Sequence, residues 1–252
     1  MHAVAPIPGT RRAPRAGLNG RGSKPARGAQ GWLPHPNAGK KKLILRCWYS
    51  LGDIVLLTAA VRDLHRAYPG QFLTDVRTPF DGLWLHNPWA TPVRDEEGEV
   101  VECEYALLNE SNRAPYHAIH GFIEHLNRRF DLRIRPTEFR GDIHLHPLEK
   151  AWTPQVVERL GFDVPYWIIA AGGKTDCTIK WWATDRWQAV VDHFRGRILF
   201  VQVGAADHCH PPLRGVLDLR GQTDVRQLVR LVHHSIGVLC PITVSVISST
   251  TI

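Results

Sequence analysis

The sequence predicts an α/β fold, and three observations support this prediction. From Lys42 onward, short apolar runs alternate with segments in which apolar residues recur at helical spacing. Gly52 and the pair Gly172-Gly173 follow apolar runs, where loops would leave the strands. A proline-containing passage over residues 131–165 separates two blocks of this alternation. Because strands that alternate with helices form parallel sheets with right-handed crossovers, we expect two Rossmann-like lobes.

The first block predicts strands and helices that would build a lobe over residues 42–150. The expected strands are 42–48, 72–78 and 100–108, and the expected helices are 54–68 and 116–130. In the first helix Leu57, Val61 and Leu64 share one face, and Pro69-Gly70 ends the helix.

The second block predicts a lobe over residues 151–252. A short helix is expected within 154–162, strands over 166–173 and 197–204, helices over 184–194 and 223–235, and a further strand from 236. Thr184 and Thr223 are the predicted N-caps of the two longer helices. Only about three strands are expected here, and "VSVISSTTI" (244–252) predicts no closing helix. We therefore expect this second lobe to be truncated or altered at its C-terminal end.

The N-terminal segment, residues 1–41, differs in composition from the rest. Residues 1–42 hold nine basic and no acidic side chains, so the other 210 residues carry 22 basic and 24 acidic groups. The segment is rich in proline, glycine and arginine, and it cannot bury enough apolar surface to offset its chain entropy. We expect a disordered tail, either simply solvated or loosely attracted to an anionic membrane surface. Nucleic-acid binding would rest on this tail alone and is not expected.

Other features narrow the cellular setting. The sequence has no apolar run of 18 or more residues and no apolar core of a secretory signal. Its five cysteines are scattered and never form a C-x-x-C pair, which indicates free thiols in a reducing compartment. We expect a cytoplasmic protein, with peripheral contact to the inner membrane face as the role open to the tail.

Asp53 is the first candidate site residue. It lies between a predicted strand and a predicted helix, where an aspartate commonly caps the helix. After Gly52, at the carboxyl end of a strand, the same carboxylate would face a ligand and could act as a general base. The spacing favours the cap and leaves the base role open.

Two further stretches could meet a ligand. In "AAGGKTDCTIKWW" (170–182), Gly172 and Gly173 allow close backbone approach. Four polar side chains of this stretch could contact phosphate oxygens: Lys174, Thr175, Thr178 and Lys180. A polar surface turn explains the same stretch, and the P-loop pattern is absent. In "QVGAADHCH" (202–210), Asp207 could bind a ribose, although a plain surface loop is the simpler interpretation. Adjacent ligands on so short a loop rarely complete a metal site, so no metal is predicted.

Taken in order, several motifs resemble one family. They are "SLGDIVLLTAAVRDLHRAYP", "LHNP" (85–88), "KWWATDRWQAVV" (180–191), "VQVGAADH" (201–208) and "LRGQTDVRQLVRLV" (219–232). This combination resembles the ADP-heptose:lipopolysaccharide heptosyltransferase family of glycosyltransferases. The resemblance covers most of residues 42–240.

The resemblance implies a GT-B-like fold whose first lobe binds the acceptor and whose second lobe binds a nucleotide-sugar donor. It implies an inverting transfer of a heptose or related sugar to a lipopolysaccharide or other hydroxyl, without a metal or other cofactor. Asp53 would be the catalytic base. The donor, expected to be ADP-linked, would meet Gly172, Gly173, Thr175, Lys180, Asp207, Gln222 and Thr223.

The last part of the chain departs from the family pattern. The family continues with an Asp-x-Gly segment and a histidine on the next helix, whereas this sequence reads "LCPITVSVISSTTI". The alternative hypothesis is therefore a catalytically inactive remnant, or a nucleotide- or partner-binding module of the same fold.

Overall fold

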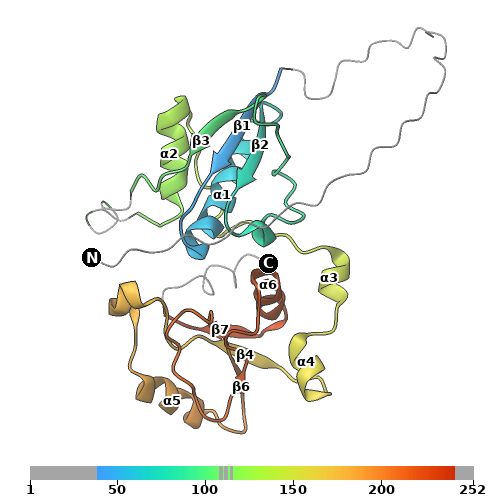
Figure 1. Ribbon diagram of the computed structural model, residues 1–252, viewed down its shortest axis with the longest axis vertical. Coiled ribbons are helices and arrows are strands. Elements are labelled where there is room, and N and C mark those ends of the chain that lie inside the picture. Colours follow the sequence, from blue (N-terminus) through green and yellow to red (C-terminus); the bar gives the residue numbers. More distant parts are fainter. Residues whose placement is uncertain (1–38, 108–109, 111–112, 114–115, 242–252) are drawn as a thin grey trace, which may run out of the picture. The chain divides into compact units, whose positions relative to one another are not determined.

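The computed structural model describes residues 39–107, 110, 113 and 116–241. The predicted tail over 1–41 lies almost entirely outside this part of the chain. Residues 244–252, on which the expectation of an incomplete second lobe partly rests, also lie outside it. The described residues form two separate parallel sheets with helices packed against them (Figure 1).

The first sheet has three parallel strands in the order β2-β1-β3. They are β1 (Lys41–Arg46), β2 (Phe72–Arg77) and β3 (Glu99–Glu102). In the register of the sheet, Leu43 of the central strand lies opposite Thr74 and Glu99. All three strands therefore end at the same edge, and the loops after β1 and β3 leave it side by side.

The two faces of the first sheet are covered differently. Leu43 and Leu45 are buried in a core that α1 (Leu51–Ala67) and α2 (His120–Phe130) complete. Ile44 points to the opposite face, where a Cβ at Gly98 would lie 2.8 Å from its side chain. A segment without helix therefore approaches that face closely.

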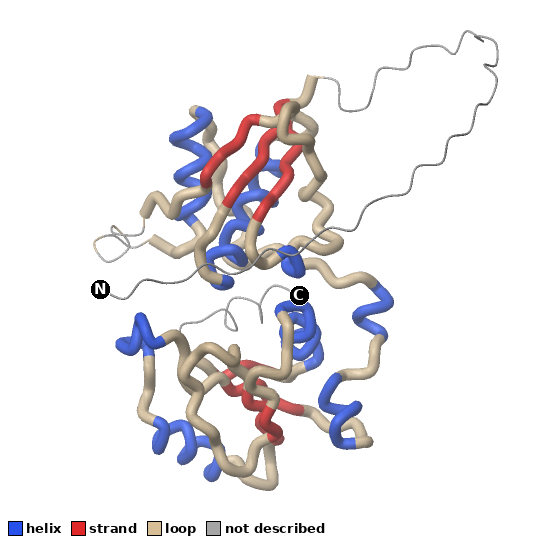
Figure 2. The backbone as a smooth tube through the Cα atoms, in the orientation of Figure 1, coloured by secondary structure: helices blue, strands red, loops and turns tan. Residues whose placement is uncertain are grey.

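The second sheet has four parallel strands in the order β6-β5-β4-β7. They are β4 (Tyr166–Ile169), β5 (Leu199–Gln202), β6 (Leu217–Asp218) and β7 (Gly237–Leu239). Figure 2 shows these strands in red and the surrounding helices in blue.

Both faces of this second sheet are covered by helices, because adjacent residues of a strand point to opposite sides. Ile168 packs in one core with residues of α4 (Gln155–Leu160) and α6 (Val225–His234). Its neighbour Ile169 packs in another core with α5 (Thr184–His193). Burial of each such side chain contributes about 1.5–3 kcal/mol.

The predicted α/β alternation with parallel sheets is confirmed, with some corrections to its elements. The second sheet has four strands, whereas about three were expected, because the two residues of β6 are too few to show a period. A short helix, α3 (Pro147–Ala151), lies in the passage predicted to be irregular. The helix expected from residue 116 begins at His120.

The predicted helix caps are wrong at three positions. The first helix starts at Leu51, and its N-cap is Ser50, so Asp53 stands inside the first turn. Thr184 is already helical, and Ala183 is the N-cap of α5. Asp224 caps α6 in place of Thr223, because its side chain accepts a hydrogen bond from Gln227 N three residues later.

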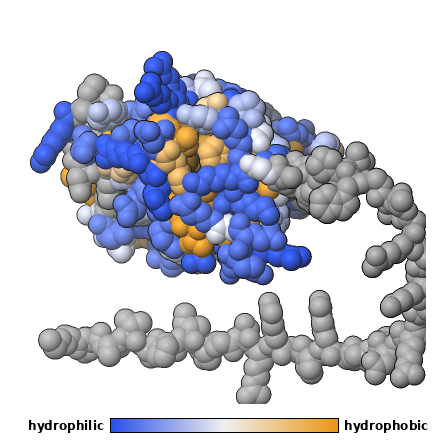
Figure 3. Space-filling view, turned by 90° about the horizontal axis from the view of Figure 1, so that it is seen from above, coloured by the Kyte–Doolittle hydropathy of each residue, from blue (hydrophilic) through white to orange (hydrophobic). Residues whose placement is uncertain are grey.

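The described residues group together as one compact unit. The division into an acceptor-side lobe, 42–150, and a donor-side lobe, 151–252, therefore stays a prediction. Within the described residues, no helix combines the length and apolar character needed to cross a membrane. The face of the molecule in Figure 3 is mostly hydrophilic, with a smaller hydrophobic area.

Candidate functional site

Asp53 lies at the carboxyl edge of the first sheet, in the first turn of α1. The chain leaves β1 at Arg46 and enters the helix only five residues later. Asp53 and Ser50 form a capping box: Oδ2 of Asp53 accepts from the Ser50 hydroxyl at 2.6 Å and from Ser50 N at 3.1 Å. Oδ1 has no partner in the described part of the chain. The cap therefore fixes the carboxylate and leaves one oxygen available.

The neighbours of Asp53 do not compete with it for a proton at neutral pH. Burial raises the pKa of the Cys47 thiol to about 11, and the charge of Asp53 adds to the rise. Burial also raises the pKa of Tyr105, again with a contribution from Asp53. The Tyr105 hydroxyl donates to Ala118 O at 3.0 Å. The Cys47 thiol and the Tyr105 hydroxyl therefore both keep their protons at neutral pH.

The loops at the carboxyl edge of the second sheet are joined to one another through their backbones. Gly173 and Cys209 exchange two hydrogen bonds of 3.0 Å, which connects the loops after β4 and β5. Gly221 N donates to Gly204 O at 2.8 Å, which connects the loops after β5 and β6. Arg220 also donates from its side chain to His210 O. The predicted donor residues therefore share one edge, on three connected loops.

Gly172 has a structural reason to be glycine. Its φ is +149°, and a Cβ there would lie 2.1 Å from the carbonyl oxygen of Cys209. Gly172 thus allows two loops to approach, whereas the sequence analysis explained it by the approach of a ligand. Its predicted contact with a donor remains untested.

Thr175 and Lys180 begin and end the 3₁₀ helix η2 (Thr175–Lys180). Both side chains are exposed, and neither makes a hydrogen bond or ion pair within the described residues. Next to them, the indole nitrogen of Trp181 is buried without a partner in the same part of the chain and lies 3.4 Å from the position of a Cβ at Gly173. This loop therefore presents an exposed ammonium and an exposed hydroxyl without partners among the described residues, beside a buried N–H group that also has none there.

Gln222 and Thr223 lie on the loop between β6 and α6 and line a small cavity of about 110 Å³. Its other lining residues are Gln155, Glu158, Arg159, Leu219 and Gln227. Gln222 is held by Arg159, which donates to its Oε1 at 3.0 Å, and by its own bond to Asp218 O. Typical ligand pockets have about 300–1,000 Å³, so this cavity could hold only part of a nucleotide sugar.

Asp207 is the least fixed of the predicted site residues. Its side chain is 85% exposed, and its carboxylate lies 3.8 Å from Nε2 of the neighbouring His208. Among the described residues, no group of three or more histidine, cysteine, aspartate or glutamate side chains could hold a metal ion.

The structure thus collects the predicted residues at two sheet edges. Asp53 belongs to the first, and the seven predicted donor residues belong to the second. Ser50 was not predicted as a site residue, although its spacing from Asp53 is that of a capping box. Arg226 and Glu149, which form an ion pair from α6 to α3, were not predicted either. No local pattern reveals that pair, because the two residues are 77 positions apart.

Comparisons with known proteins identify solved structures with the same arrangement. No protein-family model matches the sequence, and no curated protein matches it significantly. The glycosyl transferase family 9 protein of Veillonella parvula DSM 2008 has a TM-score of 0.61 at 13% identity, covering 83% of this chain and 77% of its own. The ADP-heptose lps heptosyltransferase II of E. coli has a TM-score of 0.52 at 14% identity, covering 82% and 81%. TibC, an iron-containing dodecameric glycosyltransferase from enterotoxigenic E. coli H10407, has a TM-score of 0.56 at 14% identity, covering 84% of this chain and 56% of its own. The chain shares the fold of these glycosyltransferase structures.

Proposed function

We propose that this protein is a glycosyltransferase that moves a sugar from a nucleotide-sugar donor to an acceptor hydroxyl. The observation that carries the proposal is the carboxylate of Asp53, held by Ser50 at a sheet edge within a fold shared with solved glycosyltransferases. A fixed carboxylate with one unoccupied oxygen suits a general base that accepts a proton from a hydroxyl.

In the proposed reaction, Asp53 takes the proton of the acceptor hydroxyl through Oδ1. The acceptor oxygen forms a bond to the anomeric carbon of the donor sugar, and the bond from that carbon to the diphosphate oxygen breaks. Attack from the face opposite the leaving group inverts the anomeric configuration. The released nucleoside diphosphate carries away the electron pair of the broken bond.

The second sheet would bind the donor. Lys180 and Thr175 have unused polar groups suited to the charge that grows on the leaving diphosphate. The cavity beside Gln222 and Thr223 would take the base, since Gln155 Oε1 is a buried acceptor without a partner in the described chain. An adenine amino group would match that acceptor. Asp207 is proposed as the ribose contact, on a side chain that orders when the donor binds.

An ADP-linked heptose is the proposed donor, and a lipopolysaccharide or similar saccharide hydroxyl is the proposed acceptor. The support is the likeness in fold to a heptosyltransferase whose name includes both substrates. The proposed mechanism uses neither a metal nor another cofactor. The basic residues before β1 would give loose contact with an anionic membrane surface, where a lipid-linked acceptor would lie.

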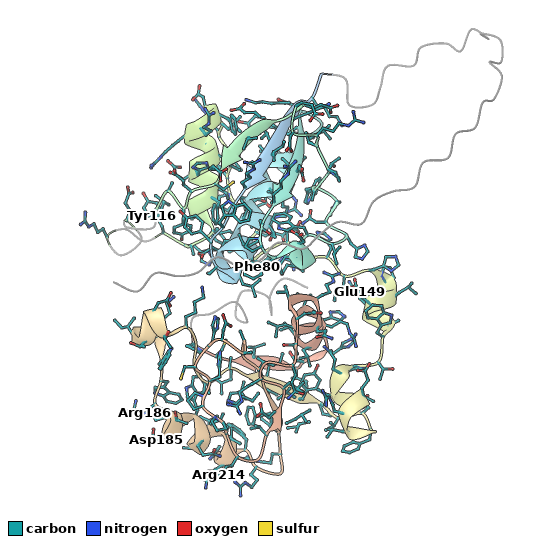
Figure 4. The ribbon with its side chains drawn as sticks, in the orientation of Figure 1. Phe80, Tyr116, Glu149, Asp185, Arg186 and Arg214 are labelled. Carbon is teal, nitrogen blue, oxygen red and sulfur yellow. The ribbon has the colours of Figure 1, made fainter. Side chains whose placement is uncertain are left out.

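The test is Asp53→Asn in a transfer assay with ADP-heptose. The amide oxygen can still accept from Ser50, so α1 should stay intact while the rate falls by about 10²–10⁴-fold. Asp185→Asn is the matched control, because Asp185 also lies in the first turn of a helix, α5, and is exposed (Figure 4). Its rate should equal that of the wild type.

Unchanged transfer by Asp53→Asn would eliminate the base role. ADP binding without transfer by the wild-type chain would favour the alternative, a nucleotide-binding module of the same fold. Calorimetric titration with ADP separates these outcomes, because it measures donor-site binding without requiring the reaction.

A further inference from the structure

Arg226, on the first turn of α6, contacts three other segments of the chain with one side chain. Its Nε donates to Glu149 Oε1 at 2.7 Å, and its Nη2 donates to Glu149 Oε2. Nη2 also donates to His144 O at 2.6 Å, and Nη1 donates to Gly82 O at 3.2 Å. The side chain is only 13% exposed. A bidentate pair with two added carbonyl contacts uses the planar fork that distinguishes arginine from lysine.

Glu149 is itself held in place on α3 (Figure 4). Its Oε2 accepts from His146 N at 2.7 Å in a capping box, and its side chain is 8% exposed. The hydrogen bonds from Arg226 lower the pKa of Glu149 to about 2, so the pair stays charged at neutral pH. Arg226 therefore meets a partner whose position is already fixed.

The helix α6 takes part in two cores. Val225 and Val229 belong to the core that surrounds the first sheet, whereas Leu231 and Val232 belong to a core of the second. At the first turn, a Cβ at Gly82 would lie 3.8 Å from Arg226, which is an ordinary van der Waals contact. The orientation of α6 is therefore constrained by the segments that pack against the first sheet.

The residues just before α6 carry the proposed base-binding side chains. Gln222 and Thr223 precede the N-cap Asp224, and Arg226 follows that cap by two residues. Any rotation of the first turn of α6 would therefore move this loop and the cavity it lines.

We propose that Arg226 is a positioning residue: through Glu149, Gly82 and His144 it holds the 219–224 loop, and with it Gln222 and Thr223, in the geometry that binds the donor base. This inference rests on the proposed function for the identity of the ligand. The contacts themselves do not depend on it, so the two can be tested separately.

The first measurement is amide hydrogen exchange of the full chain, followed by mass spectrometry. In Arg226→Gln and Glu149→Gln, residues 219–229 should exchange at least about fivefold faster, while β4 and β5 keep their wild-type protection. The matched control is Arg128→Gln, which removes an exposed ion pair with Glu124 on α2 and should change neither region. Unchanged exchange over 219–229, or an equal rise in every strand, would overturn the proposal.

The second measurement is calorimetric titration with ADP. Arg226→Gln should weaken ADP binding by about fivefold or more, within the usual range of coupling between neighbouring sites. Arg226→Lys keeps the positive charge beside Glu149 but loses the planar guanidinium, so it should bind ADP more tightly than Arg226→Gln and less tightly than the wild type. Equal ADP affinity in wild type and Arg226→Gln would contradict a positioning role.

Failure of the proposed function gives a different pattern. If the wild-type chain does not bind ADP, the donor assignment fails, while the exchange measurement still decides whether Arg226 holds the loop. If the Arg226 and Glu149 variants lose protection over 219–229 but the wild type does not bind ADP, Arg226 holds the loop and the loop does not bind this nucleotide.

Discussion

The carboxyl edges of the two sheets are held in different ways. At the first edge a side chain fixes the structure, because the Ser50 hydroxyl orients Asp53. Farther along α1, toward the opposite edge of the same sheet, the buried Arg62 donates to three carbonyl oxygens of residues 138–141. At the second edge, backbone hydrogen bonds join the loops, with close approaches at Gly172 and Gly204. The side chains of Thr175 and Lys180 remain exposed there.

This difference suits two chemical tasks. A general base needs one group held at a defined place before the substrate arrives. A site for a flexible, charged donor needs a fixed loop path and side chains free to close on phosphate and sugar oxygens. The comparison can be tested with variants that remove either the side-chain contacts around the first sheet or the backbone contacts between the loops of the second, while leaving the other kind intact.

The largest loss of stability should follow Arg62→Met. Arg62 and Asp63 are at most 1% exposed and form an ion pair at 3.0 Å, and Asp63 also accepts from Thr137. Removing the cation leaves a buried carboxylate and three carbonyls without their donor, which should cost about 3–5 kcal/mol. Urea denaturation measures this loss.

Arg66→Gln is the control for Arg62→Met, because Arg66 lies on the same helix as Arg62 and its ion pair with Glu138 is exposed. That change should cost about 0–1 kcal/mol. Equal losses of stability in the two variants would show that the buried Arg62 pair stabilises the protein no more than an exposed ion pair does. The part of the molecule around the first sheet would then not depend on the Arg62 side chain.

The next largest effect should follow Gly172→Ala at the second edge. The new Cβ would lie 2.1 Å from the Cys209 carbonyl oxygen, so the bridge between the loops after β4 and β5 must shift. We expect a loss of about 3 kcal/mol in the free energy of unfolding. ADP affinity should fall as well, because the loop that carries Lys180 begins there.

Gly196→Ala separates backbone conformation from loop contact. Gly196 has a φ of +73° and no atom within 4 Å of a new Cβ. Gly196→Ala should therefore lower the free energy of unfolding by about 1–2 kcal/mol, through backbone conformation alone. Thermal unfolding of both variants provides the comparison. If Gly172→Ala lowers stability no more than Gly196→Ala does, the contact between the two loops does not contribute to stability.

The sequence predicted the alternation of strands and helices because their apolar periods are local. It also located Asp53 at the carboxyl edge of the first sheet, since the apolar run of β1 ends shortly before it and the helical pattern starts directly after it. It did not identify Ser50 as the cap, because the apolar pattern of the helix starts only at Ile54. The S-x-x-D spacing of Ser50 and Asp53 would have corrected that.

What the sequence could not predict depends on long-range contact. Two such contacts join residues far apart in the chain: the backbone bridge between Gly173 and Cys209, and the ion pair between Arg226 and Glu149. Neither contact has a periodic signal, since each depends on how packed elements meet. The two-residue strand β6 was missed for the opposite reason: it is local but too short to show any period.

The smallest predicted effect concerns the cap that orients Asp53. Ser50→Ala removes the hydroxyl that donates to Asp53 at 2.6 Å but keeps the bond from Ser50 N. The helix should lose about 1 kcal/mol, the usual cost of replacing an N-cap serine with alanine. Chemical denaturation of both Ser50→Ala and Thr184→Ala would measure it.

Thr184→Ala is the matched control, because Thr184 was expected to cap α5 but lies one residue inside the helix. Its change in stability should stay within about 0.5 kcal/mol. If the Asp53 carboxylate is the base, Ser50→Ala should also slow transfer, because the remaining bond to Ser50 N restricts the carboxylate less. If Ser50→Ala slows transfer but keeps full stability, Ser50 acts by orienting the base and not by stabilising the helix. If Ser50→Ala lowers stability but transfers at the wild-type rate, Ser50 acts only as the helix cap.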